Sequence, residues 1–433
     1  MDLFLNRKSF VVKSLAITVT ALMMSGANAA TSDKEEIRKL RQEVEALKAL
    51  VQEQRQVQQQ QQQVQQQQQV QLAEVKAQPQ PVTAPVSPLA SLKSKAGADV
   101  NLYGFVRGDA NYIIEGADED FNSVDKVGGK VAQTNDKLRA TAKTTRLGLD
   151  FTAPVNGAKV GGKIEVDFAG TNDGLRIRHA YLTYNDWLFG QTTSNFLSNH
   201  APEMIDFSTN IGGGTKRVPQ VRYNYKLGPA TQLFVSAEKA DSSTSTAGDL
   251  KYRLPALTAK ITQGYAEGRG SASARVLVEN YKSELADDEK TGWGVAVGTD
   301  FKVSDPLKLF ADVSYVVGDS SYLYGSNAAY AVAPNKDIEQ NKFVAVQVGG
   351  TYKILPNLRS TLAYGAEFAD DGTDYAKVYT AGNEKVQQAW INFIYTPVKP
   401  IDLGLEYVNG KRETFAGQSY KDNRIGLMAK YSF

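Results

Sequence analysis

The 433-residue chain lacks cysteine entirely and has only two histidines, His179 and His200. Without thiols, disulfide scaffolds, thiolate metal sites and cysteine nucleophiles are excluded, and two histidines cannot form a three-histidine metal centre. The chain also lacks an excess of one charge, because 49 Lys and Arg residues stand against 47 Asp and Glu residues. A nucleic-acid binder needs a concentrated basic excess for its phosphate contacts. The composition therefore predicts no nucleic-acid partner, no metal and no cofactor.

A long hydrophobic run is missing too, so the sequence predicts no membrane-spanning helix. The most apolar stretch, residues 14–24, is well below the about 20 residues that a bilayer crossing requires. Basic residues precede this stretch and small residues follow it at 26–29. A basic segment, a short apolar segment and a small-residue cleavage site together are typical of a secretory signal. We predict a signal peptide over residues 1–29 and export of the rest of the chain.

An apolar heptad pattern begins shortly after this segment. Apolar side chains recur three and four residues apart at Ile37, Leu40, Val44, Leu47 and Val51, which is the a/d seam of a coiled coil. Glutamates at g positions and basic residues at the following e positions can pair between parallel chains. The pattern therefore predicts a coiled coil within residues 30–77, and with it an oligomer.

Low-complexity sequence follows the heptads. Glutamine makes up fifteen of the twenty residues at 52–71. Glutamine has good helix propensity but gives a helix little to bury, so this tract is either a continued helix or a disordered spacer. Four prolines between positions 79 and 88 then predict a semi-rigid linker over residues 78–97. A new domain begins near Ala98.

Residues 98–433 consist of short segments in which apolar and polar residues alternate. In the first segment Val100, Leu102 and Val106 share one face, while Arg107 and Asp109 share the other. This period of two predicts β-strands with one apolar face. Sixteen such segments can be placed, among them residues 139–153, 307–317, 358–369 and 422–433.

The connections between these segments favour a membrane barrel. Short turns, such as residues 228–230 and 304–306, alternate with mostly longer loops, as in outer-membrane barrels. A water-soluble β-sandwich also alternates apolar and polar positions. The export signal, the even strand number, the Tyr and Phe near strand ends and the lack of a second covering sheet favour the barrel. We predict an all-β transmembrane barrel of about 16 antiparallel strands over residues 98–433, preceded by the α-helical coiled coil.

Several short motifs occur along the barrel in a specific order: LYGFVRGD at 102–109, RLGLDF at 146–151, RHAYLTY at 178–184, LFGQT at 188–192 and VPQVRY at 218–223. With its C-terminal Tyr-Ser-Phe, the chain resembles the trimeric sixteen-strand porins. Its coiled coil, glutamine tract and proline linker resemble, more narrowly, those of the DcaP-like porins of Gram-negative bacteria. Many general porins have an arginine after the glycine that matches Gly190, but this chain has Gln191, so that arginine cannot be transferred.

This resemblance implies a passive diffusion channel of the outer membrane for small hydrophilic solutes. Such solutes are often negatively charged, and dicarboxylates are the associated class. It also implies a homotrimer in outer-membrane lipid and lipopolysaccharide, with the coiled coil in the periplasm, and Phe433 resembles the signal that the barrel-assembly machinery reads. Two other functions stay open, a non-selective general porin and an anchor for a periplasmic coiled-coil rod.

Basic residues within the strands predict where the pore is charged. An Arg or Lys on the lipid face at mid-membrane would cost about 2–4 kcal/mol, so these residues should point into the lumen. Strand parity assigns to the lumen Arg107, Arg146, Lys163, Arg222, Lys260, Arg359 and Arg424. Arg424, Arg107, Arg146 and Lys163 lie on strands that adjoin when the barrel closes, which predicts a basic arc. Arg178 has the parity of apolar neighbours and faces the lumen only if a β-bulge intervenes or if it lies beyond the membrane.

The connection over residues 193–215 matches the porin loop that folds into the barrel. It carries Glu203, Asp206 and a glycine hinge at 212–214. We therefore predict that this loop, with its two acids, forms the constriction of the pore.

An enzymatic function would depend on His200, which lies near Ser194, Ser198 and Asp206 in the sequence. Proximity along the chain does not establish the geometry of a catalytic triad. An outer-membrane hydrolase is therefore disfavoured, and we predict no catalytic residues.

Overall fold

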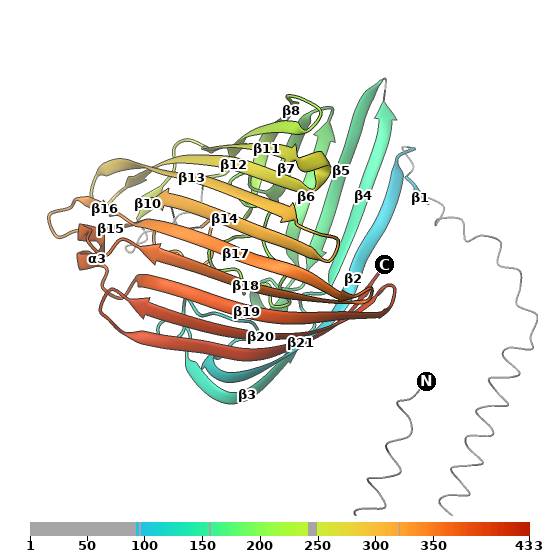
Figure 1. Cartoon of the computed structure of the whole chain (residues 1–433). Coiled ribbons are helices and arrows are strands. Elements are labelled where there is room, and N and C mark those ends of the chain that lie inside the picture. Colours follow the sequence, from blue (N-terminus) through green and yellow to red (C-terminus); the bar gives the residue numbers. More distant parts are fainter. Residues whose placement is uncertain (1–91, 95–96, 156, 241–248, 320) are drawn as a thin grey trace, which may run out of the picture. The chain divides into compact units, whose positions relative to one another are not determined.

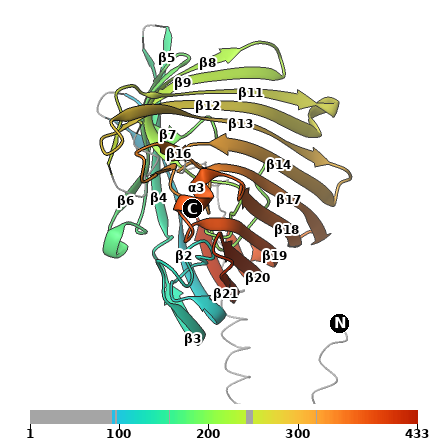
Figure 2. The ribbon, with the colours of Figure 1, turned by 90° about the vertical axis from the view of Figure 1, so that its left-hand side faces the viewer.

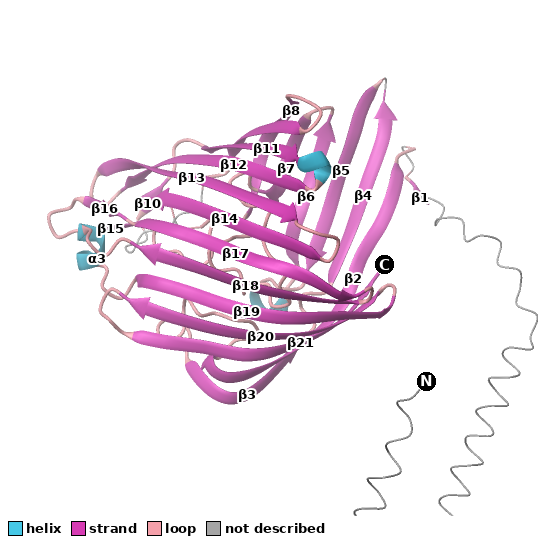
Figure 3. Ribbon diagram, in the orientation of Figure 1, coloured by secondary structure: helices cyan, strands magenta, loops and turns pink. Residues whose placement is uncertain are grey.

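The computed structural model describes residues 92–94, 97–155, 157–240, 249–319 and 321–433 (Figure 1). The predicted signal peptide and coiled coil, and most of the predicted linker, lie outside the described residues. Strands dominate the described part, and helix is confined to short connections (Figure 3). No helix among the described residues is long and apolar enough to cross a membrane.

Sixteen antiparallel strands close into one barrel. In chain order they are β2 (Asp99–Ala117), the interrupted strand β3 (Gln133–Thr141) and β4 (Arg146–Val155), β5 (Ala158–Asp167), β6 (Arg176–Tyr184), β7 (Trp187–Thr193), β8 (Arg217–Lys226), β9 (Thr231–Glu238), β11 (Ala256–Tyr265), β12 (Gly270–Ser283), β13 (Asp288–Lys302), β14 (Leu307–Val317), β17 (Lys342–Leu355), β18 (Leu358–Ala369), β19 (Asn383–Val398), β20 (Ile401–Thr414) and β21 (Ser419–Ser432). The expectation of an all-β barrel of about sixteen strands is confirmed.

Smaller elements extend this sheet or lie in its connections. The two-residue strands β1 (Leu92–Lys93) and β10 (Leu250–Lys251) pair with β2 and β12. Outside the sheet are the hairpin β15 (Tyr330–Val332) and β16 (Ile338–Gln340), the helix α3 (Asp374–Val378) and the 3-10 turns Thr171–Asp173 and Ala266–Gly268. The barrel itself closes where β2 pairs with β21, with Arg107 opposite Lys430 (Figure 2).

The sequence predicted one continuous second strand over residues 139–153, and this prediction is wrong. The strand is broken at residues 142–145, so β2 pairs with β3 along one half and with β4 along the other. At the break, the Arg107 amide donates to Thr145 Oγ1 at 3.1 Å, and the same hydroxyl donates to Arg107 O at 3.2 Å. One threonine side chain therefore replaces the backbone partner that the ladder loses there.

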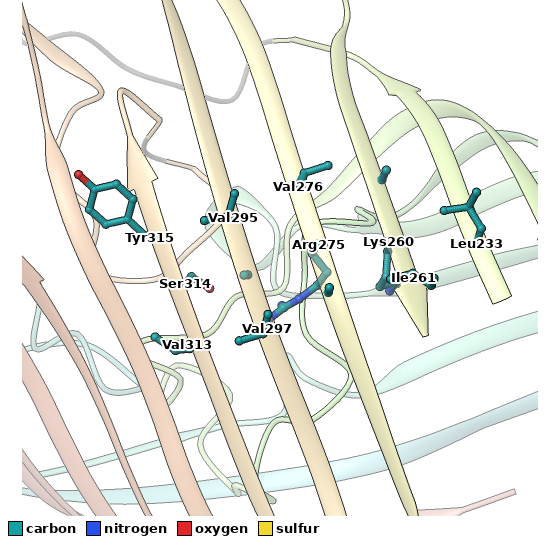
Figure 4. Close-up of a pocket in the computed structure, with 13 residues that line it drawn as sticks. Leu233, Lys260, Ile261, Arg275, Val276, Val295, Val297, Val313, Ser314 and Tyr315 are labelled. Carbon is teal, nitrogen blue, oxygen red and sulfur yellow. The ribbon is translucent and has the colours of Figure 1, made fainter. Parts of the chain in front are cut away.

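The alternation of the sequence separates an apolar outer face from a polar inner face. Figure 4 shows part of the wall, where Val276, Val295 and Val297 line an outer apolar hollow of about 410 Å³. Arg275, next to Val276 in β12, and Lys260 of the neighbouring β11 lie on the other face and are buried, whereas those valines are exposed. The outer apolar surface suits lipid, and the polar groups are gathered inside.

The connections give the barrel two different ends. Short turns such as residues 227–230 and 303–306 lie at one end, called the turn end. Long connections such as residues 118–132 and 318–341 lie at the other, called the loop end, which carries β15, β16 and α3 (Figure 1). This asymmetry is the one that the sequence predicted.

One long connection, residues 194–216, packs against the inner face of the wall and is called the inward loop. Its glycine hinge is needed for close approach, because Gly212 has a φ of +81° and a Cβ there would meet Val346 O at 2.1 Å. From the wall side, a Cβ on Gly365 would meet Ile211 O at 2.0 Å. Only glycine therefore permits this contact between loop and wall.

Replacing Gly365 with Ala should force the inward loop away from the wall. We expect the free energy of unfolding to fall by about 1–3 kcal/mol, the usual cost of overpacking. The gel band of the folded, heat-resistant barrel should therefore disappear at a lower temperature. Gly108→Ala is the control, because a Cβ at Gly108 meets no atom within 4 Å. Equal melting of the two variants would show that this contact does not hold the loop.

Candidate pore constriction

The first half of the inward loop is fixed to the wall opposite it by buried charges. Arg275 of β12 donates to Phe196 O at 3.1 Å and pairs with Asp312 of β14 at 2.6 Å. Ser198 of the loop donates to the same carboxylate at 2.6 Å. Arg275 and Asp312 are both buried, and their charges compensate each other. The pair therefore holds the loop without adding net charge to the lumen.

His200 has partners that its sequence neighbours did not indicate. Its Nδ1 lies 2.8 Å from Asp300 Oδ2, and its Nε2 lies 3.2 Å from Ser273 Oγ. This is the order of groups in a hydrolase triad. However, Ser273 is paired within the sheet with Thr262 and Gly298, so its amide belongs to the ladder rather than to an oxyanion hole. We interpret His200 as a clamp between the loop and strands β12 and β13.

The second half of the loop is held by β20 and β2. Glu406 of β20 accepts from the amides of Ile205 at 2.8 Å and Asp206 at 2.9 Å. Arg107 of β2 donates to Ile205 O at 2.5 Å and pairs with Asp109 at 2.6 Å. An acid and a base from two strands thus satisfy both backbone groups of Ile205.

Both predicted acids of the loop are bound. Glu203 forms a bidentate pair with Arg359 of β18, with both N···O distances 2.8 Å. Asp206 is buried and accepts from the amides of Asn122 at 2.7 Å and Ser208 at 2.9 Å. This burial raises the pKa of Asp206 above its ordinary value. Neither acid therefore presents an unpaired carboxylate to the lumen.

Strands β4–β8, which lie between the two sets of loop contacts, carry most of a group of basic residues. We call this group the cationic wall; it consists of Arg146, Lys163, Arg178, Arg217 and Arg222, with Lys260 of β11. Part of its charge is compensated. Arg178 pairs with Glu165 at 2.7 Å and Asp167 at 2.9 Å, and Arg146 lies 3.4 Å from Glu165.

Arg178 joins the cationic wall through a β-bulge. The register between β5 and β6 shifts between Glu165 and Val166, which are opposite His179 and Ile177, so Arg178 is the extra residue. The shift places Arg178 beside two inward carboxylates although its parity is that of outward residues such as Leu182. Of the two conditions that the sequence set for a lumenal Arg178, the β-bulge is thus present.

The other end of the cationic wall has little compensating charge. Among the described residues, Arg217, Arg222 and Lys260 have no carboxylate within ion-pair distance. Arg222 and Lys260 lie 5.7 and 5.6 Å from the ring centre of Phe234. The Nε atoms of Arg217 and Arg222 are buried without an acceptor. These N–H groups find no acceptor in the protein and can donate hydrogen bonds to an anion.

The structure divides the predicted lumenal residues into two groups. Arg107, Arg359 and Arg424 hold loops, and Arg424 is fully buried against Asp422 at 2.9 Å and Ala117 O at 3.0 Å. The others, Arg146, Lys163, Arg178, Arg222 and Lys260, lie on the cationic wall, where Lys163 pairs with Asp150 at 3.0 Å. The strands of the predicted basic arc adjoin, but their basic side chains do not form one group.

Arg217 is a residue that sequence parity missed. In β8 it has the parity of Pro219 and Val221, which are exposed on the outer face. It is the first residue of the strand, and Arg146 and Arg178 act on it electrostatically. It also lines a polar cavity of about 260 Å³ with Lys216. The signal that could have found it is this basic pair directly after the glycine hinge.

A closed sixteen-strand barrel with a loop packed inside it and a charged inner wall defines an outer-membrane channel of the porin class. The chain belongs to the DcaP outer membrane protein family, whose sequence pattern matches residues 17–433. Among the described residues, no group of His, Asp and Glu side chains is placed to hold a metal ion.

Solved structures agree with this assignment. The crystal structure of the outer membrane channel DcaP of Acinetobacter baumannii is 83% identical, with a TM-score of 0.77 over 80% of this chain and 100% of that one. The anion-selective porin of Comamonas acidovorans shares the fold at 13% identity, with a TM-score of 0.53 over 78% and 100% of the two chains. The trimer form of OmpT of Vibrio cholerae also shares the fold, at 13% identity and a TM-score of 0.51 over 78% of this chain and 99% of that one. No curated protein sequence matches the chain.

The Glu203–Arg359 pair gives a test of how the loop is neutralised. Arg359→Gln leaves Glu203 unpaired, so the permeability ratio of anions to cations should fall, while Glu203→Gln should raise it. The double variant should return close to the original ratio, because it removes one charge of each sign. The reversal potential in a KCl gradient is measured for the original protein, the two single variants and the double variant. Identical values would place this pair outside the conduction path.

Proposed function

We propose that this channel conducts small hydrophilic solutes and favours negatively charged ones such as dicarboxylates. The observation that carries the proposal is the uncompensated end of the cationic wall, Arg217, Arg222 and Lys260, in a barrel whose loop acids Glu203 and Asp206 are bound. A narrow passage with low-dielectric walls concentrates the field of such charges and raises the local concentration of anions.

This charge distribution favours an anion channel over the alternatives. A non-selective general porin would need positive and negative charge in balance along the passage. Carboxylates compensate Arg178 and Lys163, but none lies in ion-pair contact with Arg217 or Arg222 among the described residues. A barrel that only anchors a periplasmic rod would need no such asymmetry. We therefore rank selective conduction first, and a catalytic function last.

The variant Arg217→Gln/Arg222→Gln should reduce the permeation of succinate several-fold and that of a neutral sugar little. The reason is that the change removes positive charge while keeping a polar side chain at each position. Liposome swelling measures both solutes, and the reversal potential in a KCl gradient should move towards cation preference. Arg269→Gln, directly after the 3-10 turn Ala266–Gly268 at the turn end, is the control.

Salt dependence separates charge from size in the same experiment. The Debye length falls from about 10 Å at 0.1 M to about 3 Å at 1 M, so the difference between the two proteins should shrink at high salt. Equal losses for succinate and sugar, unchanged by salt, would mean that the substitutions altered the width of the pore, and anion preference would be rejected.

We also propose that the channel is a homotrimer set in lipid and lipopolysaccharide, with residues 30–77 as a periplasmic coiled coil. The C-terminal Phe433 exchanges backbone hydrogen bonds with Gly104 at 3.0 Å, so it completes the barrel and remains 45% exposed. That exposure keeps the side chain accessible to the barrel-assembly machinery. Native mass spectrometry of the solubilised protein should give three chains, and a monomer or dimer would contradict this arrangement.

A further inference from the structure

A second charged cavity lies at the loop end, apart from the cationic wall. It has a volume of about 360 Å³ and is formed by the connections at residues 118–132, 318–341 and 370–382, with β20 and the turn that follows it. Figure 2 looks towards this end of the barrel. None of its lining residues belongs to the cationic wall or to the inward loop, so the cavity is not part of the constriction.

The walls of this cavity are held by polar contacts between segments far apart in the sequence. Asn327 and Asn383 exchange hydrogen bonds, with Asn327 Nδ2 2.7 Å from Asn383 O and the Asn383 amide 2.6 Å from Asn327 Oδ1. Asn383 Nδ2 also donates to Asp125 O at 3.2 Å. Arg412 donates to Val127 O at 2.7 Å. The cavity is thus built from fixed loops, and its charged groups have defined positions.

Three cations and one acid line this cavity. Lys126, Lys130 and Arg412 stand against Asp125. Neither lysine has a carboxylate within ion-pair distance among the described residues. Arg412 is more than nine-tenths buried, and its Nε has no acceptor. Burial raises the pKa of Asp125, and Lys126 and Arg412 oppose that rise. A single carboxylate cannot balance three cations, so the cavity keeps a net positive charge.

The remaining lining suits a ligand with several oxygens. Gln418 offers a polar side chain, and Gly129 leaves open the space beside Arg412, where a Cβ would lie 3.0 Å from Nη1. Unpaired ammonium groups and a buried guanidinium Nε are donors that lack acceptors, and charge-assisted bonds to carboxylate or phosphate are the strong ones. A neutral sugar would leave those charges uncompensated.

We propose that this cavity binds a small oxyanion, a carboxylate or a phosphate, at the loop end of the channel. Lys126, Lys130 and Arg412 supply the charge, and Gln418 orients the oxygens. Asp125 limits the affinity of the site, because its carboxylate would repel the bound anion. The site does not depend on the selectivity of the constriction, since the two share no residue.

The test is calorimetric titration of the full-length, detergent-solubilised protein with succinate and, separately, with inorganic phosphate. Lys126→Gln/Lys130→Gln should weaken binding by at least about tenfold, as expected for loss of charged donors. Asp125→Asn should strengthen it several-fold, a gain that misfolding cannot produce. Lys377→Gln is the matched control, because Lys377 lies at the same end in α3, outside the cavity and paired with Asp374.

The outcomes separate this site from the proposed selectivity. Unchanged affinity in both cavity variants overturns the site, as does binding that is lost only in Arg217→Gln/Arg222→Gln, which would assign the anion to the constriction. Weakened binding in Lys126→Gln/Lys130→Gln with no anion preference in the intact channel supports the site and rejects the proposed selectivity. Binding of one probe alone supports the site and identifies whether carboxylate or phosphate is its ligand.

Discussion

The fixing of the inward loop to the barrel wall is the constraint on which the rest of the structure depends. A loop inside a barrel exposes backbone groups that must find partners, and here charged side chains of the wall supply them. Glu406 takes two consecutive amides, and Arg107 takes the carbonyl between them. These charged side chains are therefore bound to the loop. Because the contacts lie on β9–β14, on β17–β21 and on β2, the basic side chains of β4–β8 lie outside them, and Lys260 of β11 is the member of the cationic wall that also contacts the loop, at Asn199.

The strands were largely predictable from the sequence, and the reason is local. Segments 307–317 and 358–369 appear as β14 and β18 with the same bounds, since a period of two is visible within a dozen residues. The inner and outer faces followed from the same period and the cost of burying charge in lipid. The break at residues 142–145 could not be predicted this way, because a Thr145 hydroxyl replaces a backbone partner without disturbing the alternation.

The roles of the charged residues were only partly predictable, because parity gives a face and not a partner. Arg107 and Arg424 face inward as expected, yet one holds the inward loop and the other is fully buried beneath the loop end. The partners of Glu203 and Arg107 are 156 and 98 residues distant, at Arg359 and Ile205. Only closure of the barrel brings such groups together. Arg178 needed a bulge that the sequence could require but not locate.

The break between β3 and β4 has a consequence for how this family can vary. In an unbroken strand, inserting one residue reverses the face of every side chain beyond it. Here β3 and β4 pair with β2 independently, on either side of Thr145. A change of length in residues 118–132 or in β3 can therefore be absorbed before Arg146, which keeps its face. The outer surface near β3 is free to diverge between relatives while the lumen beside it stays the same.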